Sequence, residues 1–185
     1  MPLSGTQWVG QFPTSISTEN LTPTFRTAVD AFIAALDQAG AQHRIAATFR
    51  PVERAFLMHW SYRVGYGNFD PRQVPAINGV NINWLHLDRQ GRYDETASRR
   101  AARAMVGAYD IDYAPALVSR HTQGRAIDMS ISWNGTLSIL NQSNVTVNIA
   151  TAPQISHNTA LHAVGATYGV HKLAIDPPHW SDDGH

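Results

Sequence analysis

Three side chains of the kinds that bind divalent metal ions lie in two short segments of the sequence. The first segment, Ser119–Asp128, contains His121 and Asp128, and the second, Asp176–Trp180, contains His179. Two imidazoles and one carboxylate match the three protein ligands with which a catalytic zinc ion keeps its fourth position open for water. We therefore predict that these three side chains bind Zn²⁺ together and that the metal lowers the pKa of this water toward about 7.

Two further residues have the chemistry that hydrolysis at such a site requires. Asp176 precedes His179 by three residues, and its carboxylate can take a proton from water and pass it to a leaving amine. Arg50 follows a predicted strand, and its guanidinium can stabilise a developing oxyanion. The alternatives are a turn residue before proline for Asp176 and a surface charge for Arg50. We expect three neighbours of the metal ligands to contact substrate or support the site: Ser119, Arg120 and Trp180.

Composition narrows the class of protein. The chain has 185 residues with 43% hydrophobic side chains, which is enough for one domain, residues 1–185, with its own core. The formal net charge of +0 argues against a nucleic-acid binder. The absence of cysteine excludes thiolate ligands, so nitrogen and oxygen atoms must hold any zinc. No apolar run approaches the roughly 18 residues of a membrane span, and the N-terminus lacks the pattern of a signal peptide.

The first half of the chain shows clear helical signals. Residues 1–22 are polar and rich in turn residues, which predicts an extended lead-in. Thr22 and Pro23 then predict the start of a helix that Gly40 ends. Arg44 to Phe49 is predicted to be a strand, and Pro51 to open a second helix. Residues 65–91 lose all periodicity, which indicates a long loop or a lid over a site.

The second half alternates between strands and helices. Asp94 to Ala108 is rich in alanine and predicts a helix, and Ala126 to Ser132 alternates apolar and polar residues as a half-buried strand does. The Asn134-Gly135 pair predicts a hairpin turn after this strand. Ser156 is predicted to cap a helix that runs to about Tyr168, followed by a last strand from Val170 to Ile175. A few strands with separate helices predict an α+β fold.

The two metal-binding segments resemble those of a known family. Ser119, His121, Gly124, Ala126 and Asp128 occupy every fixed position of an S-x-H-x-x-G-x-A-x-D signature. This signature is typical of the zinc peptidases that include VanY-type D-Ala-D-Ala carboxypeptidases, the dipeptidase VanX, murein endopeptidases and the Hedgehog signalling domain. The Asp-Pro-Pro-His-Trp run is similar to the second half of the family pattern. The resemblance covers roughly residues 43–180.

The resemblance implies a fold, a site and a reaction. It implies a small antiparallel sheet with helices packed to one side. It assigns zinc binding to His121, Asp128 and His179, and the catalytic base to Asp176. Thr48-Phe49-Arg50 is similar to the family's arginine element, except that Pro51 replaces the serine that follows in relatives. An aspartate rather than a glutamate at position 176 resembles the L-alanyl-D-glutamate peptidases among endolysins and bacterial enzymes.

The expected function is therefore zinc-dependent cleavage of an amide bond in the stem peptide of bacterial peptidoglycan, by an endolysin-like L-Ala-D-Glu endopeptidase. A D-Ala-D-Ala carboxypeptidase or dipeptidase is an alternative, and so is a zinc-containing binding domain without catalysis. We expect a monomer that binds peptidoglycan but neither nucleic acid nor a membrane. Without a signal peptide, it would be made in the cytoplasm of a phage-infected or other bacterial cell and act at the cell wall.

Overall fold

The chain folds into two compact units, each assembled from two separate stretches of sequence. The structure is a computed structural model that describes residues 1–185. The first unit comprises Met1–Pro13 with Pro51–Ser119, and the second comprises Thr14–Arg50 with Arg120–His185. The sequence indicated one domain and no such division. The three predicted metal ligands and Asp176 all belong to the second unit.

The second unit begins with a short 3₁₀-helix, Thr18–Asn20, and the helix α1, Pro23–Gln38. Thr22 occupies the N-cap position and Pro23 the first turn, as the sequence predicted, although the Thr22 side chain makes no capping hydrogen bond. The chain leaves the helix through Gly40, whose φ of 74° is a left-handed conformation that glycine adopts without strain. The buried face of α1 has the predicted helical spacing and includes Phe25, Val29, Phe32 and Leu36.

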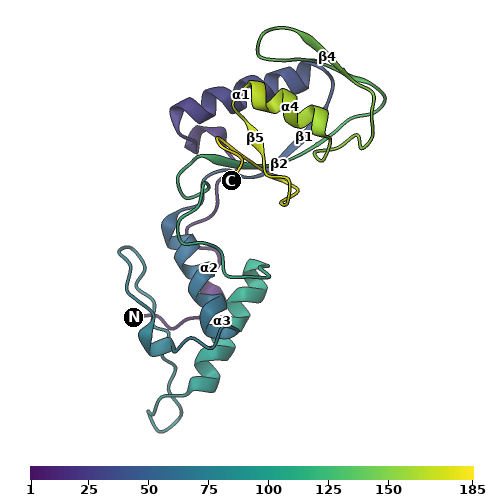
Figure 1. Cartoon of the computed structure of the whole chain (residues 1–185). Helices are drawn as coiled ribbons and strands as arrows, with labels where there is room; N and C mark the ends of the chain where they lie inside the picture. Colours follow the sequence, from purple (N-terminus) through teal and green to yellow (C-terminus); the bar gives the residue numbers. More distant parts are fainter. The chain divides into compact units, whose positions relative to one another are not determined.

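A four-stranded antiparallel sheet forms the centre of this unit, in the order β1-β2-β6-β5 (Figure 1). Its strands are β1, Gln42–Ala47; β2, Ala126–Ser132; β5, His171–Lys172; and β6, His179–Ser181. The apolar residues of β2 pack in one core with α1 and with the helix α4, Thr159–Thr167. Both helices therefore cover the same face of the sheet, which leaves the polar residues of β2 on the other face. The α+β class is confirmed.

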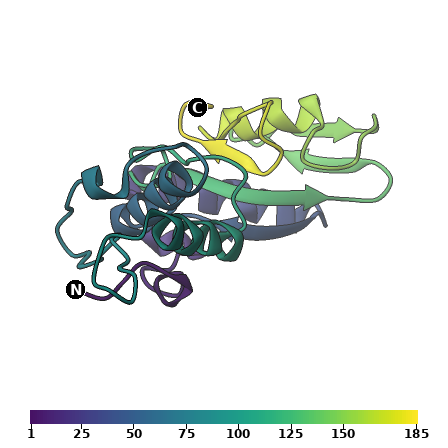
Figure 2. The same ribbon diagram turned by 90° about the horizontal axis from the view of Figure 1, so that it is seen from below.

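Two local predictions in this unit, a hairpin and a helix cap, were wrong. Strand β3, Leu137–Leu140, does not form a hairpin with β2, because it pairs with β4, Thr146–Ile149, in a separate two-stranded sheet (Figure 2). Helix α4 is capped by the side chain of Asn158 rather than by Ser156. The hydroxyl of Ser156 instead accepts a hydrogen bond from the backbone N–H of Ile131, at 2.6 Å.

The predicted last strand, Val170 to Ile175, was also wrong in extent, because only His171–Lys172 is a strand there. The chain then turns, and β6 returns alongside β5 and β2. His179 is therefore a strand residue, whereas the sequence indicated only that it follows a strand and two prolines.

The first unit is built around two helices, α2, Val52–Gly65, and α3, Glu95–Tyr109, which pack against each other. Two 3₁₀-helices, Thr6–Trp8 and Pro71–Gln73, complete its regular structure. Residues 66–91 contain no α-helix, in agreement with the loop that the sequence predicts for residues 65–91. This loop buries Val80, Ile82 and Trp84 in the core of its own unit. Among all the helices, none combines the length and the apolar character that crossing a bilayer requires.

Candidate metal centre

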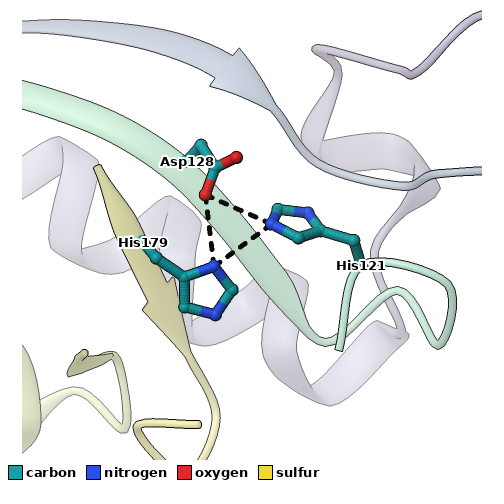
Figure 3. A group of neighbouring side chains, drawn as sticks. All are labelled: His121, Asp128 and His179. Carbon is teal, nitrogen blue, oxygen red and sulfur yellow. Dashed lines mark hydrogen bonds and ion pairs between the residues drawn. The ribbon is translucent and has the colours of Figure 1, made fainter. Parts of the chain in front are cut away.

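The side chains of His121, Asp128 and His179 converge on one point in the second unit (Figure 3). His121 Nε2 lies 3.1 Å from Asp128 Oδ1 and 3.2 Å from His179 Nδ1, and this Nδ1 lies 3.2 Å from the same carboxylate oxygen. The three ligand atoms thus form an almost equilateral triangle. The predicted grouping of these three residues is confirmed as a group that can hold a metal ion.

The antiparallel register of β2 and β6 brings two of the ligands together. Asp128 and His179 are directly opposite each other in this register, so both side chains stand on the same face of the sheet. The third ligand comes from the turn before β2. The carbonyl of His121 accepts hydrogen bonds from the backbone N–H groups of Arg50 and Gly124, at 3.1 and 3.2 Å. Gly124 has a φ of 67°, which confirms the sharp bend expected at this glycine.

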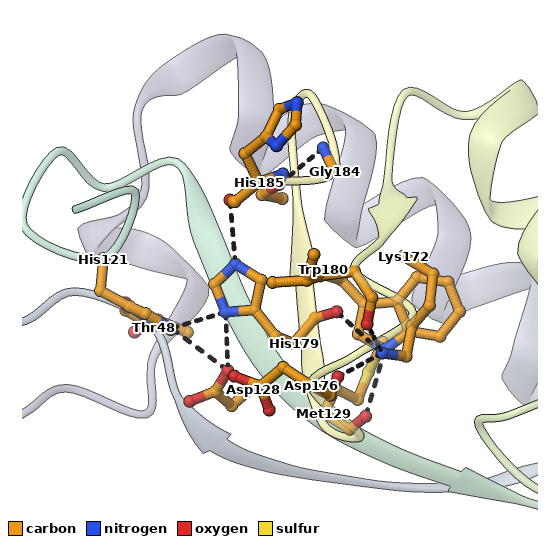
Figure 4. Close-up of polar contacts among 12 residues, drawn as sticks. Thr48, His121, Asp128, Met129, Lys172, Asp176, His179, Trp180, Gly184 and His185 are labelled. Atoms are coloured by element: carbon orange, nitrogen blue, oxygen red, sulfur yellow. Dashed lines mark hydrogen bonds and ion pairs between the residues drawn. The ribbon is translucent and has the colours of Figure 1, made fainter. Parts of the chain in front are cut away.

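The remaining nitrogen of each imidazole contacts a backbone oxygen, which orients the ring (Figure 4). His121 Nδ1 lies 2.7 Å from the carbonyl oxygen of Thr48, and His179 Nε2 lies 3.2 Å from the backbone oxygen of His185. A carbonyl can only accept, so these nitrogens donate their protons outward. In the neutral rings, His121 Nε2 and His179 Nδ1 then carry lone pairs that point toward each other and toward Asp128. Such outward contacts are typical of histidines that bind metals.

Three electron-pair donors at close range favour a cation between them. Burial opposes ionisation of Asp128, but hydrogen bonds from His121 and His179 outweigh this effect and hold the pKa of the carboxyl well below its ordinary value. Burial lowers the pKa of His179, but its hydrogen bond and charge interaction with Asp128 give a net rise. The raised pKa favours a proton on the His179 imidazole in the metal-free protein, and a divalent cation would replace this proton.

The donor set and spacing fit zinc. Imidazole nitrogen and carboxylate oxygen bind Zn²⁺ at about 2.0–2.2 Å, so the corners of a tetrahedron around it lie about 3.3–3.5 Å apart. The three observed separations of 3.1–3.2 Å are close to this edge length. His121 and His179 are only 5% and 8% exposed. The two imidazoles are therefore nearly dry, whereas the side chain of Asp128, near the start of β2, is 20% exposed.

Asp176 opens the turn that leads into β6. Its carbonyl accepts a hydrogen bond from the backbone N–H of His179 at 3.1 Å, so the predicted base and a ligand belong to one tight turn. The ammonium of Lys172 closes this turn by donating to three backbone carbonyls, those of Leu173, Asp176 and His179. Burial lowers the pKa of Lys172, while the charges of Asp176 and Asp128 oppose this effect.

Arg50 lies next to the metal ligands through the backbone, since its N–H binds the carbonyl of His121. Its side chain is half-buried. Arg50 is thus joined by a backbone hydrogen bond to the ligand His121, and Asp176 is joined in the same way to the ligand His179. Their catalytic roles stay predictions.

The predicted substrate contacts have different positions. Arg120 is engaged by an ion pair with Asp183, by a second with Asp182 at 3.8 Å and by a hydrogen bond to Gln123 at 2.9 Å. Its guanidinium is therefore used in tying the ligand turn to the end of the chain. Ser119 is half-buried at the end of the first unit, and its role stays a prediction.

Trp180 requires a correction, because its side chain is 0% exposed and cannot contact a substrate from that position. Successive strand residues point to opposite faces of the sheet. Trp180 therefore points into the core, whereas His179 points toward the other two ligands. Its ring packs on Phe32 and His162, with centroids 5.6 and 5.7 Å apart. Trp180 therefore anchors β6 from behind.

Sequence reasoning missed several groups that support the site. The carbonyl of Thr48 and the backbone oxygen of His185 are main-chain atoms, which no residue type reveals. Lys172 had a usable signal, since it is the single lysine of the chain and lies four residues before Asp176.

Comparison of the sequence with protein-family models and with curated proteins finds no match. The family resemblance therefore depends on the two sequence motifs alone.

Proposed function

We propose that this protein is a zinc-dependent peptidase that hydrolyses an amide bond in the stem peptide of bacterial peptidoglycan. The observation that supports this proposal best is the triangle of ligand atoms from His121, Asp128 and His179, with sides of 3.1–3.2 Å. Three protein ligands leave a coordination position for a reactant, whereas structural zinc sites are usually closed by four. Asp176, on the turn that carries His179, supplies the carboxylate that general base catalysis requires.

Each polar residue has a distinct task in this proposal. A zinc ion held by the three ligands would act as a Lewis acid toward the amide carbonyl and lower the pKa of water. The Asp176 carboxylate takes a proton from the attacking water and delivers it to the nitrogen of the leaving amine. The Arg50 guanidinium stabilises the negative charge on the former carbonyl oxygen. The carbonyl of Thr48 holds the His121 ring in one orientation through Nδ1.

Two measurements on the whole chain test this function. The first is the zinc content of the purified protein, expected at about one equivalent, a value that follows from a single three-ligand site. The second is the release of new amino groups from purified peptidoglycan, which the zinc-loaded protein should produce and which a chelator should abolish. One equivalent of zinc with no cleavage of peptidoglycan or its muropeptides would contradict the peptidase and favour a zinc-containing binding domain.

Mass analysis of the digested muropeptides identifies the bond. An endopeptidase acting between L-Ala and D-Glu separates the first residue of the stem from the remainder. A carboxypeptidase removes one terminal alanine instead. We expect the endopeptidase pattern, because an aspartate at position 176 resembles the L-alanyl-D-glutamate subgroup. Loss of a single alanine would overturn this choice of bond but not the peptidase itself.

A further inference from the structure

A groove of about 530 Å³ lies on the polar face of the sheet in the second unit. Its floor consists of β1 and β2 side chains that point away from the helices: Gln42, Arg44, Ser130 and Ser132. One wall contains Ile155 and His157, and another contains Pro177 and Pro178. We call this feature the β1–β2 groove. Its volume lies within the usual range of ligand pockets, roughly 300–1,000 Å³.

The groove and the metal centre are related through two elements, although no metal ligand lines the groove itself. Asp128, Ser130 and Ser132 alternate along β2, so the ligand and the groove floor share one face of the sheet. The two wall prolines lie between Asp176 and His179 in the sequence. Pro178 is fixed to β2, since its carbonyl accepts a hydrogen bond from the N–H of Met129 at 2.8 Å. A substrate held at the metal could therefore extend along β2 into the groove.

Arg44 is the cation of this groove. No acidic residue lines the groove, and Arg44 is exposed and makes no side-chain hydrogen bond or ion pair. Other arginines of the same unit are engaged with carboxylates: Arg26, Arg120 and Arg125. His43, also at the groove, is in contact with Asp37 at 3.2 Å. Arg44 therefore offers an unused bidentate site for an anion, and a carboxylate matches its planar fork.

The strand register sets the distance between this cation and the metal ligands. Arg44 is paired with Ser130, which is two residues beyond Asp128 on β2. Two residues of strand span about 7 Å, and two residues of an extended peptide lying along β2 span the same distance. A carboxylate that meets Arg44 would thus lie about two residues from the amide bond at the metal.

We propose that Arg44 determines substrate specificity by binding a free carboxylate about two residues from the cleaved bond of an extended peptide in the β1–β2 groove. This inference rests on the proposed peptidase function and adds a substrate preference to it. An acidic peptide is the occupant, because its carboxylate complements the unpaired guanidinium and its backbone suits an open groove. The cleaved bond itself lies at the metal ligands.

The test uses synthetic peptides that span the bond identified by muropeptide analysis. Each peptide carries a carboxylate one, two or three residues from this bond, or the corresponding amide. We expect the wild-type protein to cleave the acid two residues away about 10–100-fold more efficiently than its amide, as for a hydrogen bond to a charged group. Arg44→Gln should abolish this preference by raising KM for the acid and leave cleavage of the amide unchanged. Arg100→Gln, at another exposed arginine without ionic partners, is the matched control.

The possible results separate this inference from the proposed function. If wild-type protein cleaves acid and amide equally, or Arg44→Gln slows both alike, Arg44 has no such role although the peptidase stands. If no peptide is cleaved, the peptidase fails, and calorimetric binding decides the role of Arg44. In that experiment the zinc-loaded protein is titrated with acid and amide peptides that contain L-Ala-D-Glu. A tighter Kd for the acid that Arg44→Gln removes supports the carboxylate site, and equal Kd values overturn it.

Discussion

Asp128 and His179 face each other directly across the β2–β6 ladder, with Asp128 Oδ1 3.2 Å from His179 Nδ1. This pairing joins two segments that are distant in the sequence and gives the metal centre a rigid base. His121 then needs only a short turn before β2 to complete the triangle. Metal binding and the pairing of the two strands should therefore depend on each other.

Replacing one imidazole should remove the metal. We expect His121→Ala to bind no zinc after purification and to lose peptidase activity completely, because two ligands rarely hold zinc in competition with water. Zinc should also stabilise the wild-type protein by about 4 kcal/mol at a thousandfold excess over Kd and thereby raise its melting temperature. The melting temperature of the variant should not change. Elemental analysis and calorimetry check both expectations. The exposed His157→Ala is the control for zinc binding, and zinc bound normally by His121→Ala would remove His121 from the site.

Asp176 should matter for turnover but not for metal binding. Its side chain is outside the ligand triangle, so Asp176→Ala should keep its zinc while kcat falls by roughly 10²–10⁴-fold, the usual effect of losing a general base. The comparison requires the zinc content and the rate on the same preparation. A full rate in Asp176→Ala would show that another group moves the proton. Loss of zinc in this variant would instead make Asp176 a residue that shapes the turn.

The alternation in β2 made one part of the site predictable. Apolar residues at every second position indicated a strand whose other face carries Asp128, and the structure has this strand with the predicted bounds. The S-x-H-x-x-G-x-A-x-D signature likewise indicated His121 together with a bend at Gly124. Local periodicity and glycine conformation act over a few residues, so a single sequence reveals them.

Partners that depend on tertiary pairing were not predictable. The Asn134-Gly135 turn indicated a hairpin with β2, but β3 found its partner in β4, which follows it after a turn over residues 141–145. Strand β6 is three residues long and follows two prolines, so it has no pattern of its own and exists because β2 and β5 flank it. Because β6 has no pattern of its own, the sequence did not show which face of the sheet Trp180 takes. Trp180 was therefore predicted to contact substrate.

The first unit should lose stability at high pH through Tyr109. Burial raises the pKa of its phenol to about 12, partly opposed by the charge of Arg54, whose guanidinium lies 4.9 Å from the ring centroid. The folded state thus keeps the phenol proton more tightly than the unfolded state, whose pKa is about 10. The stabilisation is complete below pH 10 and is lost as the pH rises toward 12. Unfolding free energies from urea titration should fall with pH more steeply in the wild type than in Tyr109→Phe between pH 10 and 12. Parallel pH dependences of the two proteins would contradict this origin.

Lys172 should hold the turn that carries Asp176 and His179. Its ammonium donates to three carbonyls, and Lys172→Met would leave these acceptors without their donor inside a half-buried turn. We expect a loss of about 1–3 kcal/mol in unfolding free energy and a weaker affinity for zinc. Urea titration and zinc titration measure the two effects. Lys172→Arg, which keeps the charge, should recover part of both, and unchanged zinc affinity in Lys172→Met would limit Lys172 to stability.

Gly124 should be needed both for its conformation and for the space beside it. Its φ is 67°, and a Cβ at this position would lie 3.1 Å from the carbonyl oxygen of Asn20. Gly135 has a similar φ of 69° but open space around it, so Gly135→Ala measures the cost of the conformation alone, about 1–2 kcal/mol. Gly124→Ala should cost more, because the turn must also shift away from Asn20, and that shift moves His121 and weakens zinc binding. Equal losses in unfolding free energy with equal zinc affinity in the two variants would mean that the turn adapts without disturbing the ligand.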